Sequence, residues 1–134
     1  MQTVLIDDDF ISVFLTEKLL KREGLGDTVR SFQSPQEAVS YLQQAIPDQT
    51  PELIFLDLNM PLMSGWDVLE ALKPYEAELV TRCFIYLLTS SLAYSDTARA
   101  KDYTLVTELI HKPLSSNKVQ AIHTKIMERR ANLG

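Results

Sequence analysis

Short apolar runs alternate with longer stretches of helical period along this chain of 134 residues. Three runs are continuously apolar, at residues 4–6, 53–56 and 84–88. Runs of this length suit strands that are buried on both faces, as in a parallel sheet covered by helices. A weaker, broken run covers residues 105–110, and the alternating residues 29–32 predict an exposed or edge strand. The pattern therefore predicts five strands, each followed by a helix.

Helix start and stop signals lie between these runs. Apolar residues at helical spacing predict a first helix over residues 10–22. Ser34 stands before a proline and a later glutamate, which predicts the N-cap of a second helix. Ser64 begins a short third helix, which we expect to end near Lys73 because a proline follows. The last two helices are predicted over residues 95–103 and from Ser115 or Ser116 onward.

This order of elements predicts an α/β fold of the doubly wound (βα)5 class, with a five-stranded parallel sheet between two layers of helices. The length predicts a single domain over residues 1–134, with no output domain. The net charge of −5 argues against sequence-independent binding to DNA, and one cysteine, Cys83, forms no internal disulfide. No signal peptide and no apolar stretch of ~18 residues is present, so we expect a cytoplasmic protein that does not enter a membrane.

Polar side chains follow four of the predicted strands at the point where each strand ends. They are Asp7, Asp8 and Asp9 after the first strand, Asp57 at the end of the third, Thr89, Ser90 and Ser91 after the fourth, and Lys112 and Pro113 after the fifth. Ligands of open α/β sheets bind at this carboxyl edge. We therefore expect four distant segments to meet in one crevice.

Three carboxylates in one crevice repel one another unless a cation joins them. Two like charges ~4 Å apart repel by about 4 kcal/mol at an effective dielectric constant of ~20. Oxygen ligands without His or Cys favour Mg²⁺ over zinc. A phosphoryl group beside such an ion suits the Lys112 ammonium and the Thr89 hydroxyl, and Asp57 can act as a nucleophile that forms an acyl phosphate.

Four motifs of the chain resemble those of response-regulator receiver domains of two-component signalling. They read VLIDDD at residues 4–9, LIFLDLNMPLMSG at 53–65, LLTSS at 87–91 and HKP at 111–113. The resemblance covers residues 2–131 and includes every expected site residue. It implies a flavodoxin-like sheet with strand order 2-1-3-4-5 and a stand-alone receiver.

The resemblance also implies a role for each site residue. Asp57 is expected to take a phosphoryl group from the phosphohistidine of a sensor histidine kinase or a phosphotransfer protein, in a reaction that requires Mg²⁺. The implied metal site consists of Asp8, Asp57 and the backbone carbonyl of Asn59, with Asp7 holding a metal-bound water. Thr89 and Lys112 are expected to contact the phosphoryl group. The Lys112–Pro113 bond is expected to be cis, and Asn59 and Ser91 to tune autodephosphorylation.

These roles describe a signalling protein rather than an enzyme, since it would catalyse only its own phosphorylation and autodephosphorylation. An unidentified output protein would bind the face made by the fourth helix, the fifth strand and the fifth helix. Leu109 departs from the family, which often has Tyr or Phe there as a switch residue. The stretch from residue 45 to residue 52 is longer than usual and is expected to be a surface loop.

Other interpretations stay open at this point. A phosphatase of the haloacid-dehalogenase type would also use an aspartate nucleophile, but Asn59 stands where that family has a second acid. A binding module that is never phosphorylated, or a flavin-binding flavodoxin relative, would share the fold. The many apolar residues of the first helix predict either a broad buried face or a docking surface for a kinase helical bundle. Trp66, Cys83, His111 and His123 are interpreted as packing or surface residues.

Overall fold

Five strands form one parallel sheet in the order β2-β1-β3-β4-β5. The computed structural model describes residues 2–91 and 93–133, with only the backbone of residue 133, so both ends of the predicted domain, residues 1 and 134, lie outside the described residues. The strands are β1 (Thr3–Ile6), β2 (Val29–Phe32), β3 (Leu53–Asp57), β4 (Phe84–Thr89) and β5 (Glu108–His111). The predicted flavodoxin-like topology is therefore confirmed, and β2 is an edge strand as its alternating pattern indicated.

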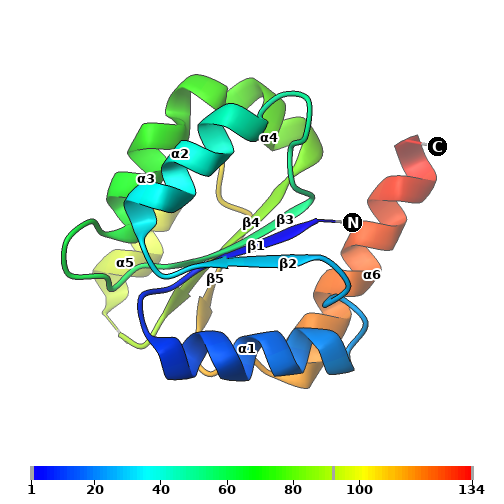
Figure 1. Ribbon diagram of the computed structural model, residues 1–134, viewed down its shortest axis with the longest axis horizontal. Helices are drawn as coiled ribbons and strands as arrows, with labels where there is room; N and C mark the ends of the chain where they lie inside the picture. Colours follow the sequence, from blue (N-terminus) through cyan, green and yellow to red (C-terminus); the bar gives the residue numbers. More distant parts are fainter. Residues whose placement is uncertain (1, 92, 134) are drawn as a thin grey trace.

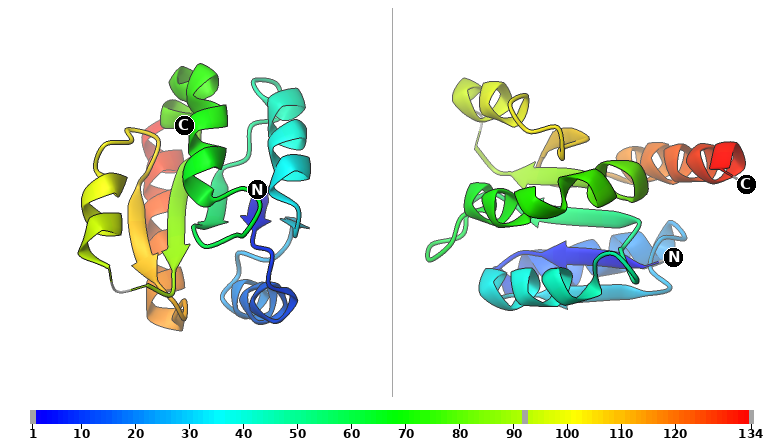
Figure 2. Two further views of the ribbon diagram at one scale, coloured as in Figure 1. Left: turned by 90° about the vertical axis from the view of Figure 1, so that its left-hand side faces the viewer. Right: turned by 90° about the horizontal axis from the view of Figure 1, so that it is seen from above.

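Helices cover both faces of this sheet (Figure 1). They are α1 (Phe10–Arg22), α2 (Pro35–Ala45), α3 (Gly65–Leu72), the 3₁₀ helix η1 (Lys73–Tyr75), α4 (Glu76–Arg82), α5 (Tyr94–Ala100) and α6 (Ser116–Leu133). The helices α1 and α6 lie on one face, whereas α2 and α3 lie on the other (Figures 1 and 2). None of the helices in the described part of the chain has both the length and the apolar character to cross a membrane.

Alternate residues of the central strands supply two separate cores. On the side of α2 and α3, the strands contribute Val4, Ile6, Ile54, Leu56, Ile85 and Leu87. On the side of α1 and α6, they contribute Leu5, Leu53, Phe55, Phe84, Tyr86 and Leu88. Successive side chains of a strand point to opposite faces, so a strand covered on both sides must be apolar throughout. This packing explains the continuous apolar runs of the sequence.

Side-chain caps begin the helices where the sequence predicts them. Ser34 Oγ accepts a hydrogen bond from the backbone N–H of Glu37, at 3.3 Å. Ser64 forms a reciprocal capping box at the start of α3. Ser115, rather than Ser116, caps α6, because its Oγ accepts from the backbone N–H of Lys118 at 3.1 Å. These caps satisfy backbone N–H groups that the first turn of each helix leaves without a partner.

The crossover from β3 to β4 differs from the prediction. The helix α3 ends at Leu72, close to the expected Lys73, but η1 and a further helix, α4, follow where no helix was predicted. Pro74 lies in the first turn of η1, where a missing backbone N–H breaks no helical hydrogen bond. Leu79 of α4 is 1% exposed, so burial of this side chain in the core holds the extra helix on the sheet.

Two other expectations need correction. The helix predicted over residues 95–103 is shorter, Tyr94–Ala100, and β5 begins only at Glu108, so the first part of the weak apolar run precedes the strand. The broad buried face proposed for α1 is wrong. Four of its large apolar side chains, Phe10, Ile11, Phe14 and Leu15, are between 53% and 70% exposed. Only Val13, Thr16 and Leu20 of α1 are buried.

Candidate functional site

The sheet register brings the predicted site residues to one edge. Asp57 is the last residue of β3 and pairs with Leu88 of β4, one position before Thr89. Thr89 in turn pairs with His111 of β5, so Lys112, the next residue, lies at the same carboxyl edge of the sheet. Asp7 comes immediately after β1, the other neighbour of β3. The four segments are far apart in sequence, and parallel pairing alone makes their ends adjacent.

Three carboxylates gather at this edge. Asp7, Asp8 and Asp57 each place a carboxylate oxygen within 4.8 Å of the others, and Asp7 and Asp57 are buried whereas Asp8 is exposed. The donors are all hard oxygen atoms, which is the ligand chemistry of Mg²⁺. Neither His nor Cys joins this cluster, so its composition does not suit zinc. The acidic cluster can therefore hold a hard divalent cation.

Lys112 supplies the positive charge of the site. Its Nζ lies 2.9 Å from Asp7 Oδ2 and 3.6 Å from Asp57 Oδ1. The same ammonium donates to Ser12 Oγ at 3.1 Å. The peptide bond between Lys112 and Pro113 is cis, as the resemblance implies. Lys112 thus stands between the two buried carboxylates of the cluster.

Burial and charge perturb the acid–base behaviour of the site. The pKa of Asp57 is raised from 3.8 to about 6, chiefly because the carboxyl group is buried and secondly because the Asp7 carboxylate is close, while Lys112 opposes the rise. Burial disfavours the charged form of Lys112, but its hydrogen bond to Asp7 and the charge of Asp57 raise its pKa above the usual value. Without a metal ion, ionisation of Asp57 therefore costs more free energy in the folded protein than in the unfolded chain.

Thr89 joins the cluster through Asn59. The Asn59 side-chain amide donates to Thr89 Oγ1 at 3.2 Å, and the backbone N–H of Ser91 donates to the same oxygen at 3.0 Å. The Asn59 backbone N–H donates to Asp57 Oδ1 at 3.3 Å. No hydrogen bond within residues 2–91 and 93–133 links the Thr89 hydroxyl directly to Asp57 or Lys112. The roles assigned to Asn59 and Thr89 stay predictions.

Gly65 explains how α3 can begin so close to the buried acid. Its backbone N–H donates to the carbonyl of Leu58 at 3.1 Å. A Cβ atom at this position would lie 2.7 Å from the Asp57 carbonyl oxygen and 2.9 Å from Leu58 Cα. Both neighbours are backbone atoms that cannot move without shifting the end of β3. Glycine is therefore required beside the acid by close packing.

The residues interpreted as packing residues are placed accordingly. Trp66 is buried and stacks on Tyr103, with ring centroids 5.7 Å apart, and the Arg99 guanidinium lies over its ring. Cys83 is buried, and this burial raises the pKa of its thiol. Within the described ranges, neither histidine belongs to a cluster that could hold a metal ion.

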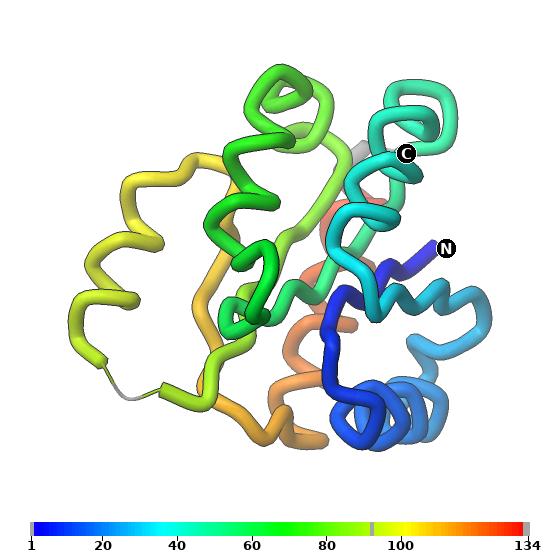
Figure 3. The backbone as a smooth tube through the Cα atoms, turned by 60° about the vertical axis from the view of Figure 1, so that its left-hand side comes forward, coloured from blue at the N-terminus to red at the C-terminus, as the bar shows by residue number. Residues whose placement is uncertain are grey.

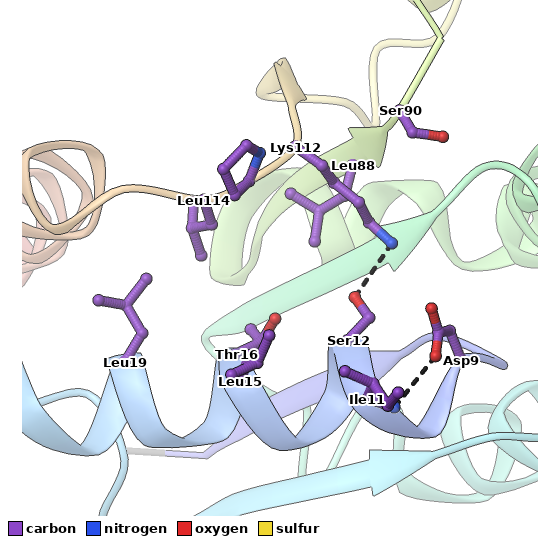
Figure 4. A pocket seen from close by; sticks show the side chains of 11 residues that line it. Asp9, Ile11, Ser12, Leu15, Thr16, Leu19, Leu88, Ser90, Lys112 and Leu114 are labelled. Atoms are coloured by element: carbon purple, nitrogen blue, oxygen red, sulfur yellow. Dashed lines mark hydrogen bonds between the residues drawn. The ribbon is translucent and has the colours of Figure 1, made fainter.

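Sequence reasoning missed Ser12 as a site residue. Its Oγ donates to Asp7 Oδ2 at 2.7 Å, in addition to accepting from Lys112. A serine in the first turn of a helix has no distinctive spacing, so only its position one turn after the acidic run could have indicated it. Ser12 also lines a groove of about 440 Å³ between α1 and the segment after β5 (Figure 4).

Comparison with known proteins agrees with this geometry. The family described as response regulator receiver domain matches residues 3–124. A two-component response regulator from Cytophaga hutchinsonii is 27% identical, with a TM-score of 0.85 over 95% of this chain and 96% of that chain. A response regulator receiver protein from Dyadobacter fermentans is 26% identical, with a TM-score of 0.83 over 95% and 98%. A search of curated protein sequences gave no match.

A more distant structure shares the fold alone. The Vibrio cholerae chemotaxis protein CheY4 is 19% identical, with a TM-score of 0.74 over 93% of this chain and 97% of that chain.

Proposed function

Because the chain belongs to the response regulator receiver domain family, we propose that it is a phosphorylation switch that accepts a phosphoryl group on Asp57. The observation that carries the proposal is the placement of Asp57. This buried carboxylate lies 3.6 Å from the Lys112 ammonium and within 4.8 Å of the carboxylates of Asp7 and Asp8. A nucleophile, a cation and further oxygen ligands therefore stand together at the ligand-binding edge of the sheet.

The proposed reaction is transfer from a phosphohistidine. An Asp57 carboxylate oxygen attacks the phosphorus atom, a P–O bond forms, and the P–N bond breaks with its electron pair going to the imidazole nitrogen. The product is an acyl phosphate, which water hydrolyses in the autodephosphorylation step. Asp8, Asp57 and the Asn59 carbonyl would hold Mg²⁺, with Asp7 binding one of its waters. The bound ion would offset negative charge on the phosphoryl oxygens.

Lys112 and Thr89 are the groups that would respond to the new charge. A phosphoryl group adds about −1.5 to −2 charge and three acceptor oxygens. The Lys112 ammonium is near enough to turn one N–H toward such an oxygen. The Thr89 hydroxyl accepts hydrogen bonds from Asn59 and Ser91, so its own proton can be donated to another oxygen. These movements would favour a different conformation of α5, β5 and α6. The changed surface would then alter how partners bind.

We propose a signalling role rather than enzymatic turnover of other substrates. If the chain were instead a phosphatase of the haloacid-dehalogenase type, a second acid would stand two residues after the nucleophile. Here that residue is Asn59, whose amide is hydrogen-bonded to Thr89. An amide cannot deliver a proton to a leaving group as a carboxylic acid can. The site therefore supports formation of a phosphorylated protein better than repeated hydrolysis.

The proposed phosphodonor is a sensor histidine kinase or a phosphotransfer protein of the cytoplasm. The exposed apolar side chains of α1 lie beside the site and suit contact with a helical bundle. The net charge of −5 gives no support to DNA as a partner. An output protein is expected on α5, β5 and α6, where half-buried Leu109 replaces the usual aromatic switch residue.

Phosphoryl uptake from a small donor tests this function. The protein is incubated with acetyl phosphate and Mg²⁺, and its intact mass is measured. We expect the mass gain of one phosphoryl group, which disappears in excess EDTA and in Asp57→Asn. Asp48→Asn, a change at an exposed acid, serves as the matched control and should gain the same mass as the wild type. An equal gain in Asp57→Asn, or none in the wild type, contradicts the proposal.

A further inference from the structure

Ser12 bonds to both charges that flank the site. It lies in α1, half-buried, close to the end of β1. Its hydroxyl donates to Asp7 Oδ2 at 2.7 Å and accepts from Lys112 Nζ at 3.1 Å. Figure 4 shows the Lys112 side chain reaching across from the segment after β5 to this hydroxyl. A single small side chain thus links the first and last motifs of the site.

The hydroxyl of Ser12 is not needed to begin the helix. Asp9 is the N-cap of α1, and its Oδ1 accepts from the backbone N–H of Ile11 at 3.0 Å. The hydrogen bonds of the Ser12 hydroxyl go to side chains of the site. Alanine has the higher helix propensity at such a position. Helix formation alone therefore gives no reason for serine here.

The contacts of Lys112 suggest what the hydroxyl does. An ammonium group has three N–H donors on a flexible stem. Two of them are engaged by Asp7 Oδ2 at 2.9 Å and by Ser12 Oγ at 3.1 Å. The next oxygen, Asp57 Oδ1, is at 3.6 Å, too far for a good hydrogen bond. With two donors fixed, the third remains available on the side of Asp57.

We propose that Ser12 is a positioning residue that orients the Lys112 ammonium toward the phosphoryl group entering at Asp57. This inference rests on the proposed function of the site. A hydroxyl can do this because it donates to Asp7 while it accepts from Lys112, whereas alanine does neither and threonine does both. Without Ser12, one N–H of Lys112 loses its fixed partner and the flexible side chain samples more orientations.

The expected effect is a slower phosphorylation reaction. The rate of phosphoryl uptake from acetyl phosphate is measured on the full chain at saturating Mg²⁺, so that weaker metal binding does not limit it. We expect Ser12→Ala to slow uptake about tenfold or more, the scale for loss of one hydrogen bond to a charged group. Ser12→Thr should restore most of the rate. Ser40→Ala, at an exposed serine of α2, is the matched control and should leave the rate unchanged.

A double-mutant cycle separates positioning from general structural damage. If Ser12 acts through Lys112, Ser12→Ala has no further effect on the rate when Lys112→Ala is already present. The same fold loss in both backgrounds overturns the inference, as does a wild-type rate for Ser12→Ala. Failure of the wild type itself to take up phosphate would instead contradict the proposed function, so the two failures are distinguishable.

Discussion

Replacement of Asp57 by asparagine is expected to stabilise the metal-free protein at pH 7 by about 2–3 kcal/mol. Burial and the neighbouring Asp7 raise the Asp57 pKa from 3.8 to about 6 in the folded protein. Each pKa unit corresponds to about 1.4 kcal/mol of difference between the two protonation states. Asparagine keeps the shape of the side chain and removes the charge, so it relieves this cost. The free energy of unfolding is measured by urea denaturation in EDTA.

The sign of the pH dependence follows from proton binding. Between pH 3.8 and about 6, the folded protein binds more protons at Asp57 than the unfolded chain does. The contribution of Asp57 to stability therefore falls as the pH rises through this window and is constant above it. The gain in free energy of unfolding that Asp57→Asn has over the wild type should vanish near pH 4 and reach its full size above about pH 6.

Two controls sharpen this test. Asp48→Asn changes an exposed acid and should alter the free energy of unfolding by less than about 0.5 kcal/mol. Addition of Mg²⁺ should stabilise the wild type more than Asp57→Asn and so narrow the difference, because a ligand stabilises the state that binds it. If Asp57→Asn instead lowers the free energy of unfolding in EDTA at pH 7, ionised Asp57 does not destabilise the folded protein and this account is wrong.

Replacement of Lys112 by alanine is expected to slow phosphoryl uptake about 100-fold, the scale seen when one group that stabilises transition-state charge is removed. The ammonium lies 3.6 Å from Asp57 Oδ1 and is only 22% exposed, so solvent cannot substitute for it fully. Its loss should also raise the Asp57 pKa further, because Lys112 is the cation that opposes the rise. Uptake from acetyl phosphate is followed by intact mass over time.

The matched control for this variant is Lys125→Ala, at an exposed lysine of α6. It should retain the wild-type rate. Both variants are compared at saturating Mg²⁺ and after circular dichroism has confirmed that each is folded, since Lys112→Ala leaves two buried carboxylates without their cation. A rate within about twofold of wild type for folded Lys112→Ala would exclude Lys112 from the reaction.

Features that depend on local sequence were predicted well. Apolar runs of three to five residues become strands when both faces are covered, and Ser34 and Ser64 cap helices through bonds within their own segments. The site edge was also predictable, because parallel strands bring the residues after each strand together whatever the loops between them do. Asp57 and Lys112 needed only this topology to be placed near each other.

Features that depend on tertiary contacts were not predictable. Pro74 correctly ended α3, but whether a new helix followed depended on burial of Leu79 against a core that the local pattern does not reveal. The apolar residues of α1 outnumber those that the sheet can cover, and periodicity alone does not say which remain exposed. Ser12 bonds both to Asp7 nearby and to Lys112, a hundred positions along the chain, and no local pattern indicates the second contact.

The arrangement of the backbone explains why so distant a contact forms. The N-terminal part of α1 and the segment that joins β5 to α6 meet on the same side of the sheet, as the path of the chain in Figure 3 shows. At the other end of α1, Arg22 donates to Ser116 Oγ at the start of α6, at 2.8 Å.

Identification of the phosphorylated residue tests the central claim most directly. The protein is phosphorylated with acetyl phosphate and Mg²⁺, treated with borohydride, digested and analysed by peptide mass spectrometry. Borohydride reduces an aspartyl phosphate to the alcohol and releases phosphate, so the side chain of residue 57 should become that of homoserine. Conversion at Asp7 or Asp8 instead, or at no aspartate, would contradict the assignment of Asp57 as the phosphoryl acceptor.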